Sequence, residues 1–287
     1  MTLPLVAGVD GSDVGLLALD WAVDEAVRHG VPLRLVYASL WERYEGALPS
    51  TGLGRPSEQV LAQHIVASAA ERAERRDPDL KVTIDVVPEE AAAALVREGD
   101  GAFALVTGSR GRGRLKGTLL GSVGLAVASR ARCPVIVVRG DAAGMAGTHE
   151  RVLLGLGDSG MSAEAVQFAF REAEVRGGVL DVVRAWRSAT HLCRHTEQVA
   201  NTPEEEASAL LDVVLDDLVA EHPGVRVHRT TREGAAGKIL VHRSATADLV
   251  VVGARPRTSP VGFQLGCVSH AVLHHALCPV AIVPERP

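Results

Sequence analysis

The sequence predicts two tandem open α/β sandwiches, each built on a five-stranded, mostly parallel sheet. Three observations lead to this prediction. The chain repeats itself, each copy alternates short apolar strands with amphipathic helices, and the strands are apolar on both faces. Continuously apolar strands are typical of parallel sheets that helices cover on both sides. At roughly 150 residues per domain, the length of 287 residues also suggests about two domains.

The repeat is clearest near the end of each copy. The run that starts at Gly108 recurs 145 residues later, at Gly253. The two runs share glycine, arginine, cysteine and proline at Gly108/Gly253, Arg110/Arg255, Gly121/Gly266, Cys133/Cys278 and Pro134/Pro279. The run from Leu5 likewise matches one near Leu153, at an offset of 147. We therefore expect one domain over residues 1–140, a small-residue linker over 141–149, and a second domain over 150–287.

Each element of the first copy follows from the spacing of its apolar residues. Short apolar runs predict strands over 3–9, 33–38, 81–87, 103–107 and 135–138. Apolar residues at helical spacing predict helices over 13–29, 57–76, 89–98 and 122–129. Gly30 ends the first helix, and the Gly-, Pro- and Ser-rich segment 45–57 is predicted to be a loop.

Residues just after the strands are the place to look for a ligand, because such sheets bind ligands at the carboxyl ends of their strands. Asp10 follows the first strand, where its carboxylate can accept hydrogen bonds from a ribose or a base. Asp10 can equally be a strand terminator, and the sequence alone leaves both readings open. Ser12 is expected to cap the next helix.

After the fourth strand comes a glycine-rich run with the pattern G-x2-G-x9-G-S, formed by Gly108, Gly111, Gly121 and Ser122. Glycines let backbone N–H groups approach an anion, and a helix that starts at Gly121-Ser122 offers unpaired N–H groups. Arg110 and the further basic residues Arg112, Arg114 and Lys116 add positive charge. The pattern is typical of a phosphate site, although it is neither a Walker loop nor the dinucleotide fingerprint.

Together with the closing Cys-Pro-Val-Ile-Val-Val, these residues resemble the universal stress protein family over almost the whole chain. The resemblance implies an adenine nucleotide alpha hydrolase-like fold that binds ATP, with or without Mg²⁺. It also implies a cytoplasmic stress or dormancy regulator whose last strands pair across a two-fold. This pairing can join the two domains of one chain, and chains can pair again into a homodimer. It assigns nucleotide contacts to Asp10, Ala38, Gly108, Gly111, Gly121 and Ser122. We add Arg110 to this predicted site because of its positive charge.

The second copy departs from this pattern. Gly157 stands in place of Asp10, Pro256 in place of Gly111, and Cys267 in place of Ser122. Proline has no N–H and a fixed φ, so the second loop is less suited to an anion. Asp158, one residue away, is a possible substitute for the missing acid. We expect the motif to be intact in the first domain and degenerate in the second.

The composition indicates which classes of binding partner are excluded. The formal net charge of −5 and the 3% aromatic content argue against binding to nucleic acid or to a membrane surface. Four cysteines without a C-x-x-C pair fit reduced thiols in a cytoplasm. His191, Cys193 and His195 offer metal ligands, but no fourth ligand stands out, so no metal site is predicted. The protein partner is not identified.

No catalytic residue set is evident, so at most a weak ATPase activity is expected. Two alternatives to the regulatory role stay open at this point. One is a slow nucleotide hydrolase or transferase, and the other is an interaction protein that binds no ligand.

Overall fold

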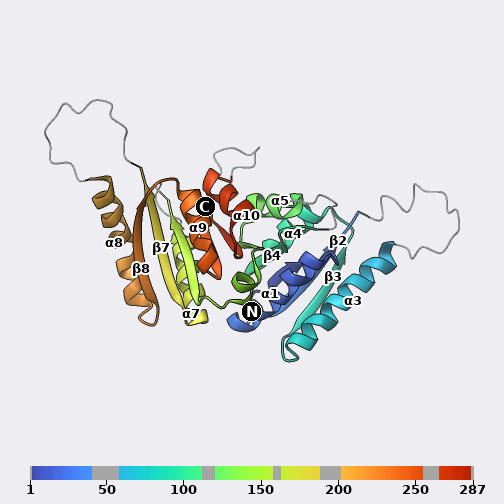
Figure 1. The fold of residues 1–287 in the computed structure, drawn as a ribbon. Coiled ribbons are helices and arrows are strands. Elements are labelled where there is room, and N and C mark those ends of the chain that lie inside the picture. Colours follow the sequence, from blue (N-terminus) through green and yellow to red (C-terminus); the bar gives the residue numbers. More distant parts are fainter. Residues whose placement is uncertain are drawn as a thin grey trace. The chain divides into compact units, whose positions relative to one another are not determined.

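The computed structural model describes residues 2–40, 58–111, 120–157, 163–187, 202–254 and 265–285. These residues form two compact units. The first contains the described residues up to Arg139, and the second contains those from Gly140 onward. Each unit is described separately below, with the labels of Figure 1.

Unit 1 holds five parallel strands, in agreement with the predicted fold class. The strands are β1 (Leu5–Gly8), β2 (Leu33–Ala38), β3 (Val82–Val87), β4 (Ala104–Gly108) and β5 (Val135–Val138). They lie in the order β3-β2-β1-β4-β5, and each neighbouring pair is parallel. The order reverses between β1 and β4, so this point of the sheet is the topological switch point.

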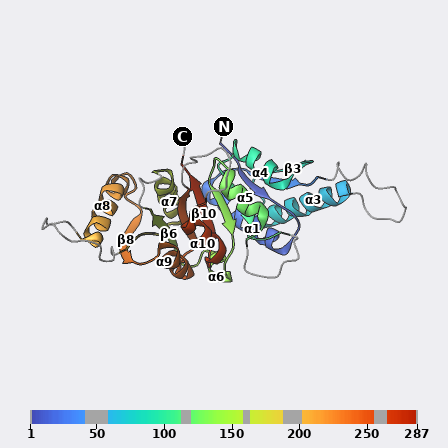
Figure 2. The same cartoon turned by 90° about the horizontal axis from the view of Figure 1, so that it is seen from above.

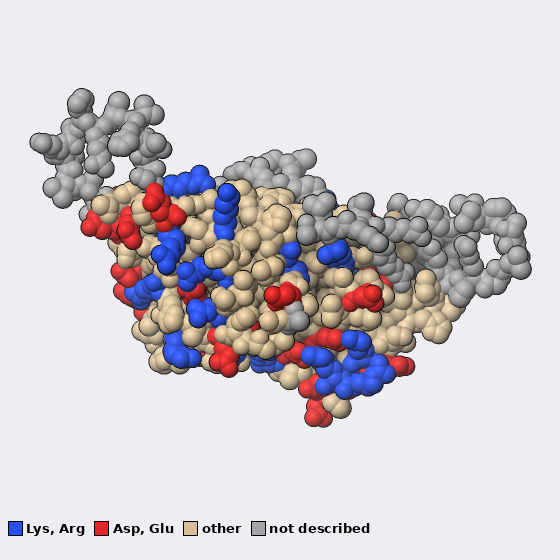
Figure 3. Space-filling model, in the orientation of Figure 1, with Lys and Arg blue, Asp and Glu red and all other residues tan. Residues whose placement is uncertain are grey.

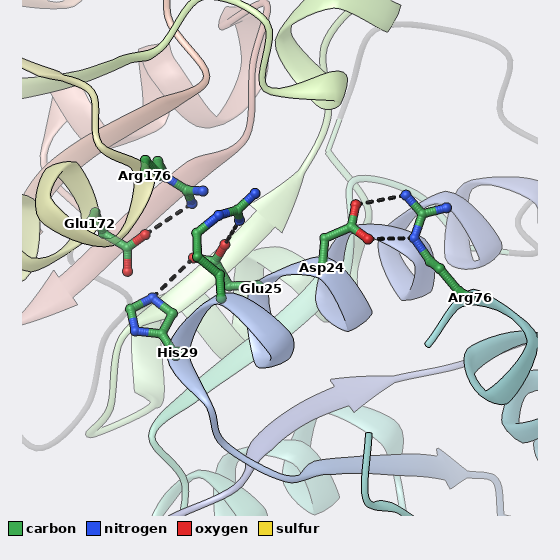
Figure 4. Close-up of polar contacts among 7 residues, drawn as sticks. Asp24, Glu25, His29, Arg76, Glu172 and Arg176 are labelled. Carbon is green, nitrogen blue, oxygen red and sulfur yellow. Dashed lines mark hydrogen bonds and ion pairs between the residues drawn. The ribbon is translucent and has the colours of Figure 1, made fainter. Parts of the chain in front are cut away.

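Helices cover both faces of this sheet. Helices α1 (Asp13–His29) and α3 (Glu58–Arg76) pack on one face, and α4 (Ala91–Gly99) and α5 (Ser122–Arg130) pack on the other (Figures 1 and 2). Ion pairs join α1 to α3. Figure 4 shows Asp24 of α1 facing Arg76 of α3, and Arg72 makes a two-pronged bond to Asp20 with both distances at 2.6 Å.

The ends of α1 follow from local sequence. Ser12 is the N-cap, and its hydroxyl accepts a hydrogen bond from the Gly15 N–H at 3.0 Å, as expected. Gly30 ends the helix with a left-handed φ of 61°, which favours glycine. Figure 4 also shows His29 in the last turn reaching back to the buried Glu25.

Unit 2 repeats the same architecture. Its strands are β6 (Arg151–Leu156), β7 (Val179–Trp186), β8 (Arg226–Glu233), β9 (Leu249–Ala254) and β10 (Val280–Pro284), in the order β10-β9-β6-β7-β8. Each neighbouring pair is again parallel. Helices α7 (Ala163–Arg176) and α8 (Pro203–Glu221) pack on one face, and α9 (Ala236–Arg243) and α10 (Cys267–His275) on the other. Within α7, Glu172 and Arg176 are paired (Figure 4).

The segment predicted as a linker contains a short helix, α6 (Ala142–Ala146). Asp141 caps it by accepting from the Gly144 N–H at 2.9 Å. Gly140 and Gly144 approach the Leu277 carbonyl so closely that an added Cβ would lie 2.2 Å and 2.6 Å from its oxygen. The sequence did not predict this helix, because its small residues have no apolar periodicity. The helix packs through the close approach of Gly140 and Gly144 to the Leu277 carbonyl.

Both signs of charge are spread over the face seen in Figure 3, and Lys and Arg side chains gather near the C-terminal end of α3. That end carries Arg72, Arg75 and Arg76. Among the described helices, none is both long enough and apolar enough to cross a membrane.

Candidate functional site

Asp10 lies two residues beyond the end of β1, half-buried at the switch point of unit 1. Its Oδ1 accepts two hydrogen bonds from Ser12, one from the backbone N–H at 2.9 Å and one from the hydroxyl at 2.7 Å. The Ser12 hydroxyl in turn accepts from the Gly15 N–H. This chain of bonds fixes the carboxylate of Asp10 against the first turn of α1.

Two glycines surround that carboxylate. A Cβ added to Gly15 would lie 2.5 Å from Asp10 Oδ1, and one added to Gly111 would lie 2.6 Å from Asp10 Oδ2. Real Cβ atoms do not come that close to an oxygen, so both positions require glycine while Asp10 keeps this rotamer. The role of Gly15 escaped the sequence reasoning, although Gly15 stands in the same short segment as Asp10 and Ser12.

The loop after β4 closes onto the start of α5. The Gly121 N–H donates to the Ser109 carbonyl at 2.8 Å, and an added Cβ on Gly121 would lie 3.8 Å from the Gly111 nitrogen. The two ends of the G-x2-G-x9-G-S run therefore meet, and Gly111 lies between Gly121 and Asp10. The sequence could not show this contact, because 112–119 separate the two ends in the chain.

The first turn of α5 has the features of an anion site. Gly121 is the N-cap, and no side chain caps the helix. Ser122 at the first helical position is exposed. Backbone N–H groups at such an end carry partial positive charge and are ready donors to a phosphate or carboxylate.

The other predicted residues lie at the same sheet edge. Ala38 ends β2 two residues beyond Val36, which pairs with Gly8 of β1. Gly108 ends β4, and an added Cβ there would lie 3.1 Å from the Val14 carbonyl oxygen. Close packing against α1 therefore favours glycine at position 108.

Arg110 is exposed in the loop after β4 and forms no ion pair with any residue in the described ranges. Its backbone lies beside the start of α5, since a Cβ added to Gly121 would lie 3.5 Å from the Arg110 Cα. The other basic residues predicted for this loop, Arg112, Arg114 and Lys116, lie outside the described residues.

The corresponding edge of unit 2 differs. Strand registers place Gly157 where unit 1 has Asp10 and Ala185 where unit 1 has Ala38. Helix α10 begins at Cys267, after the N-cap Gly266, and has no side-chain cap either. Asp158, Pro256, His191, Cys193 and His195 all lie outside the described residues.

Unit 1 thus belongs to the class of open parallel α/β domains with a glycine-rich loop and a fixed carboxylate at the switch point. Comparison with known proteins gives the family. The chain belongs to the universal stress protein family, whose model matches residues 1–139 and 148–284. The chain is also 34% identical to universal stress protein Rv2005c of Mycobacterium tuberculosis, over 98% of this chain and 97% of that protein.

A solved structure that covers nearly the whole chain agrees with the fold. A universal stress protein from Archaeoglobus fulgidus matches with a TM-score of 0.72 and 19% identity, covering 99% of this chain and 98% of that one. A universal stress protein solved in complex with cAMP covers 48% of this chain, with 27% identity and a TM-score of 0.37.

Proposed function

We propose that unit 1 binds ATP and that the second unit does not bind it comparably. One observation carries this proposal: the Asp10 carboxylate, the Gly111 backbone and the uncapped start of α5 meet at the switch point. The carboxylate accepts hydrogen bonds from the ribose, and the α5 N–H groups, Ser122 and Arg110 hold the phosphates. Ala38 borders the base through its backbone.

The residues around the site suit binding better than catalysis. Asp10 Oδ1 already accepts two hydrogen bonds from Ser12, which is the arrangement of a positioning group. If Mg²⁺ accompanies ATP, most of its ligands come from the phosphates and water, as is common for this ion. We therefore propose a cytoplasmic stress or dormancy regulator in which ATP stabilises one conformation that a partner recognises. Any hydrolysis is slow.

Nucleotide released from the purified protein tests this function. Wild-type protein is denatured, the released nucleotide is identified by mass, and its amount is compared with that from Gly111→Pro, which removes an N–H and adds bulk beside Asp10. We expect ATP from the wild type and little from the variant. Equal ATP content in both would refute the loop site, and turnover far above a slow background would favour an enzyme.

We also propose the domain limits 1–140 and 150–287, and a homodimer formed through the last strand of a domain. Strands β5 and β10 each lie at one end of the strand order of their own unit and are wholly apolar up to Val138 and Val283. A strand at the end of its unit's sheet is normally covered by another strand, chain or element. Light scattering should give twice the mass of the 30.2 kDa chain. A monomer at all concentrations would exclude the dimer.

A further inference from the structure

The second half of helix α10 carries three histidines that take no part in the proposed nucleotide site, His270, His274 and His275. The side chains of His270 and His274 are half-buried, and that of His275 is exposed. Because His270 and His274 are four residues apart, they lie on successive turns of the same helix face. At this spacing the two imidazole rings can hold one ion between them.

The rings of this pair already lie side by side. The ring centroids of His270 and His274 are 6.0 Å apart, and the two ring planes differ by only 11°. Zn²⁺ binds an imidazole nitrogen at about 2.0–2.1 Å. Rotation about the side-chain bonds is therefore enough to bring one nitrogen of each ring onto a common ion, with no change in the backbone.

The backbone that carries the pair is held in place by its neighbours. Ser269, Val272 and Leu273 are buried where α10 packs on β9 and β10. Helix α9 lies beside α10 (Figure 1), and a Cβ added to Gly237 of α9 would lie 2.8 Å from the Ala271 Cβ. Two ligands on a fixed backbone lose less conformational freedom when they bind an ion, which favours binding.

The chemistry of the two ligands selects the kind of ion. Imidazole nitrogen suits late first-row divalent ions such as Ni²⁺, Cu²⁺ and Zn²⁺, whereas Mg²⁺ prefers oxygen ligands. An Mg²⁺ ion that accompanies ATP would therefore not occupy this pair. The first copy has Leu125 and Ser129 at the corresponding positions, so its helix α5 carries no such pair.

We propose that His270 and His274 form a binding site for a divalent transition-metal ion in unit 2, with water as the remaining ligands. Zn²⁺ is the ion that we use to test it. The bound ion bridges two successive turns of α10 and so stabilises this helix. The proposal does not depend on ATP binding by unit 1.

The probe is zinc chloride, titrated calorimetrically into the full-length protein. Bound nucleotide is removed and accessible thiols are alkylated beforehand, because phosphates and cysteines also bind Zn²⁺. We expect saturable binding at micromolar Zn²⁺ by the wild type, and at least tenfold weaker binding by His270→Ala and by His274→Ala. Alanine is the best helix former, so neither variant should unfold α10, and circular dichroism checks this.

Two control variants leave the pair intact. His275→Ala removes the neighbouring exposed histidine of the same helix. The double variant His191→Ala/His195→Ala removes another two histidines four apart, which lie outside the described residues. Both controls should bind Zn²⁺ within twofold of the wild type. No saturable binding by the wild type, unchanged binding by His270→Ala, or disappearance of the binding in either control would overturn the proposal.

Thermal unfolding gives a second readout, because an ion that binds only the folded helix raises the stability of the protein. Zn²⁺ should raise the unfolding midpoint of the wild type and of His275→Ala, and EDTA should reverse this rise. The midpoint of His270→Ala should not change. An equal rise in His270→Ala would show that Zn²⁺ binds elsewhere and would refute the site.

Discussion

The Gly111 Cα faces the carboxylate of Asp10 so closely that a methyl group on it would lie 2.6 Å from Asp10 Oδ2. The requirement for glycine at position 111 therefore arises from the acid at position 10. The second copy agrees with this relationship, because Gly157 replaces the acid and Pro256 replaces the glycine together.

A double-mutant cycle of unfolding tests this coupling. Gly111→Ala should destabilise the wild type by about 1–2 kcal/mol, because the methyl group displaces the Asp10 carboxylate. The same substitution should cost almost nothing in an Asp10→Ala background. The free energies come from urea denaturation of the four proteins. Additive effects would contradict the coupling.

Ser12 is predicted to serve both stability and binding. Ser12→Ala removes the N-cap of α1 and both the hydroxyl bonds to Asp10 and Gly15. We expect a loss of about 1 kcal/mol of stability and a clear loss of ATP affinity. Thr202→Ala is the matched control, since Thr202 caps α8 in unit 2. It should destabilise the protein similarly and leave ATP affinity unchanged; a parallel loss of affinity would show that stability alone governs binding.

An ion pair between strand and helix recurs in both units with its signs reversed. In unit 1, Arg34 of β2 lies 3.1 Å from Glu98 of α4. Strand register and repeat offset place Asp181 and Arg243 at the corresponding positions, and they pair at 2.7 Å. The Asp181 side chain is only 2% exposed, so removing a partner leaves a buried carboxylate less well compensated.

This reversal predicts a charge-swap rescue. Arg243→Glu should destabilise the protein by about 3–5 kcal/mol, because two carboxylates then meet beside a buried strand. Adding Asp181→Arg restores the arrangement of unit 1 and should recover at least half of the loss. We expect the recovery to be incomplete because Arg151 lies 3.6 Å from Asp181 in the wild type, and it would repel an arginine placed at position 181. Urea denaturation measures all three proteins, and no recovery would show that the two pairs are not interchangeable.

Cysteine reactivity should follow burial. Burial raises the pKa of the Cys133 thiol to about 12, so this group stays protonated throughout the neutral range. Its alkylation in the native protein should remain negligible from pH 7 to pH 9. Cys267 is exposed and should react readily over the same range. Mass spectrometry after alkylation checks both, and modification of Cys133 at pH 8 without unfolding would contradict the prediction.

The sequence predicted the strands and helices of the fold well. It predicted less well which residues of the candidate site contact one another. Helix α1 and strands β2 and β5 have the predicted bounds, because apolar spacing and a glycine cap define them locally. The contact between Gly111 and Asp10 depends on strands β1 and β4 lying side by side, which local spacing cannot show. The sequence also did not predict the role of Gly15 or helix α6. Both depend on small residues that pack closely against other atoms, and such residues leave no hydrophobic pattern in the sequence.

Calorimetric titration of the full chain with ATP tests the central claim most directly. The matched variants are Gly111→Ala and Gly101→Ala, since an added Cβ on Gly101 meets nothing within 4 Å. We predict one ATP per chain for the wild type and for Gly101→Ala, and at least tenfold weaker binding by Gly111→Ala. Two ATP per chain, no binding at all, or unchanged binding by Gly111→Ala would contradict an ATP site in the first unit alone.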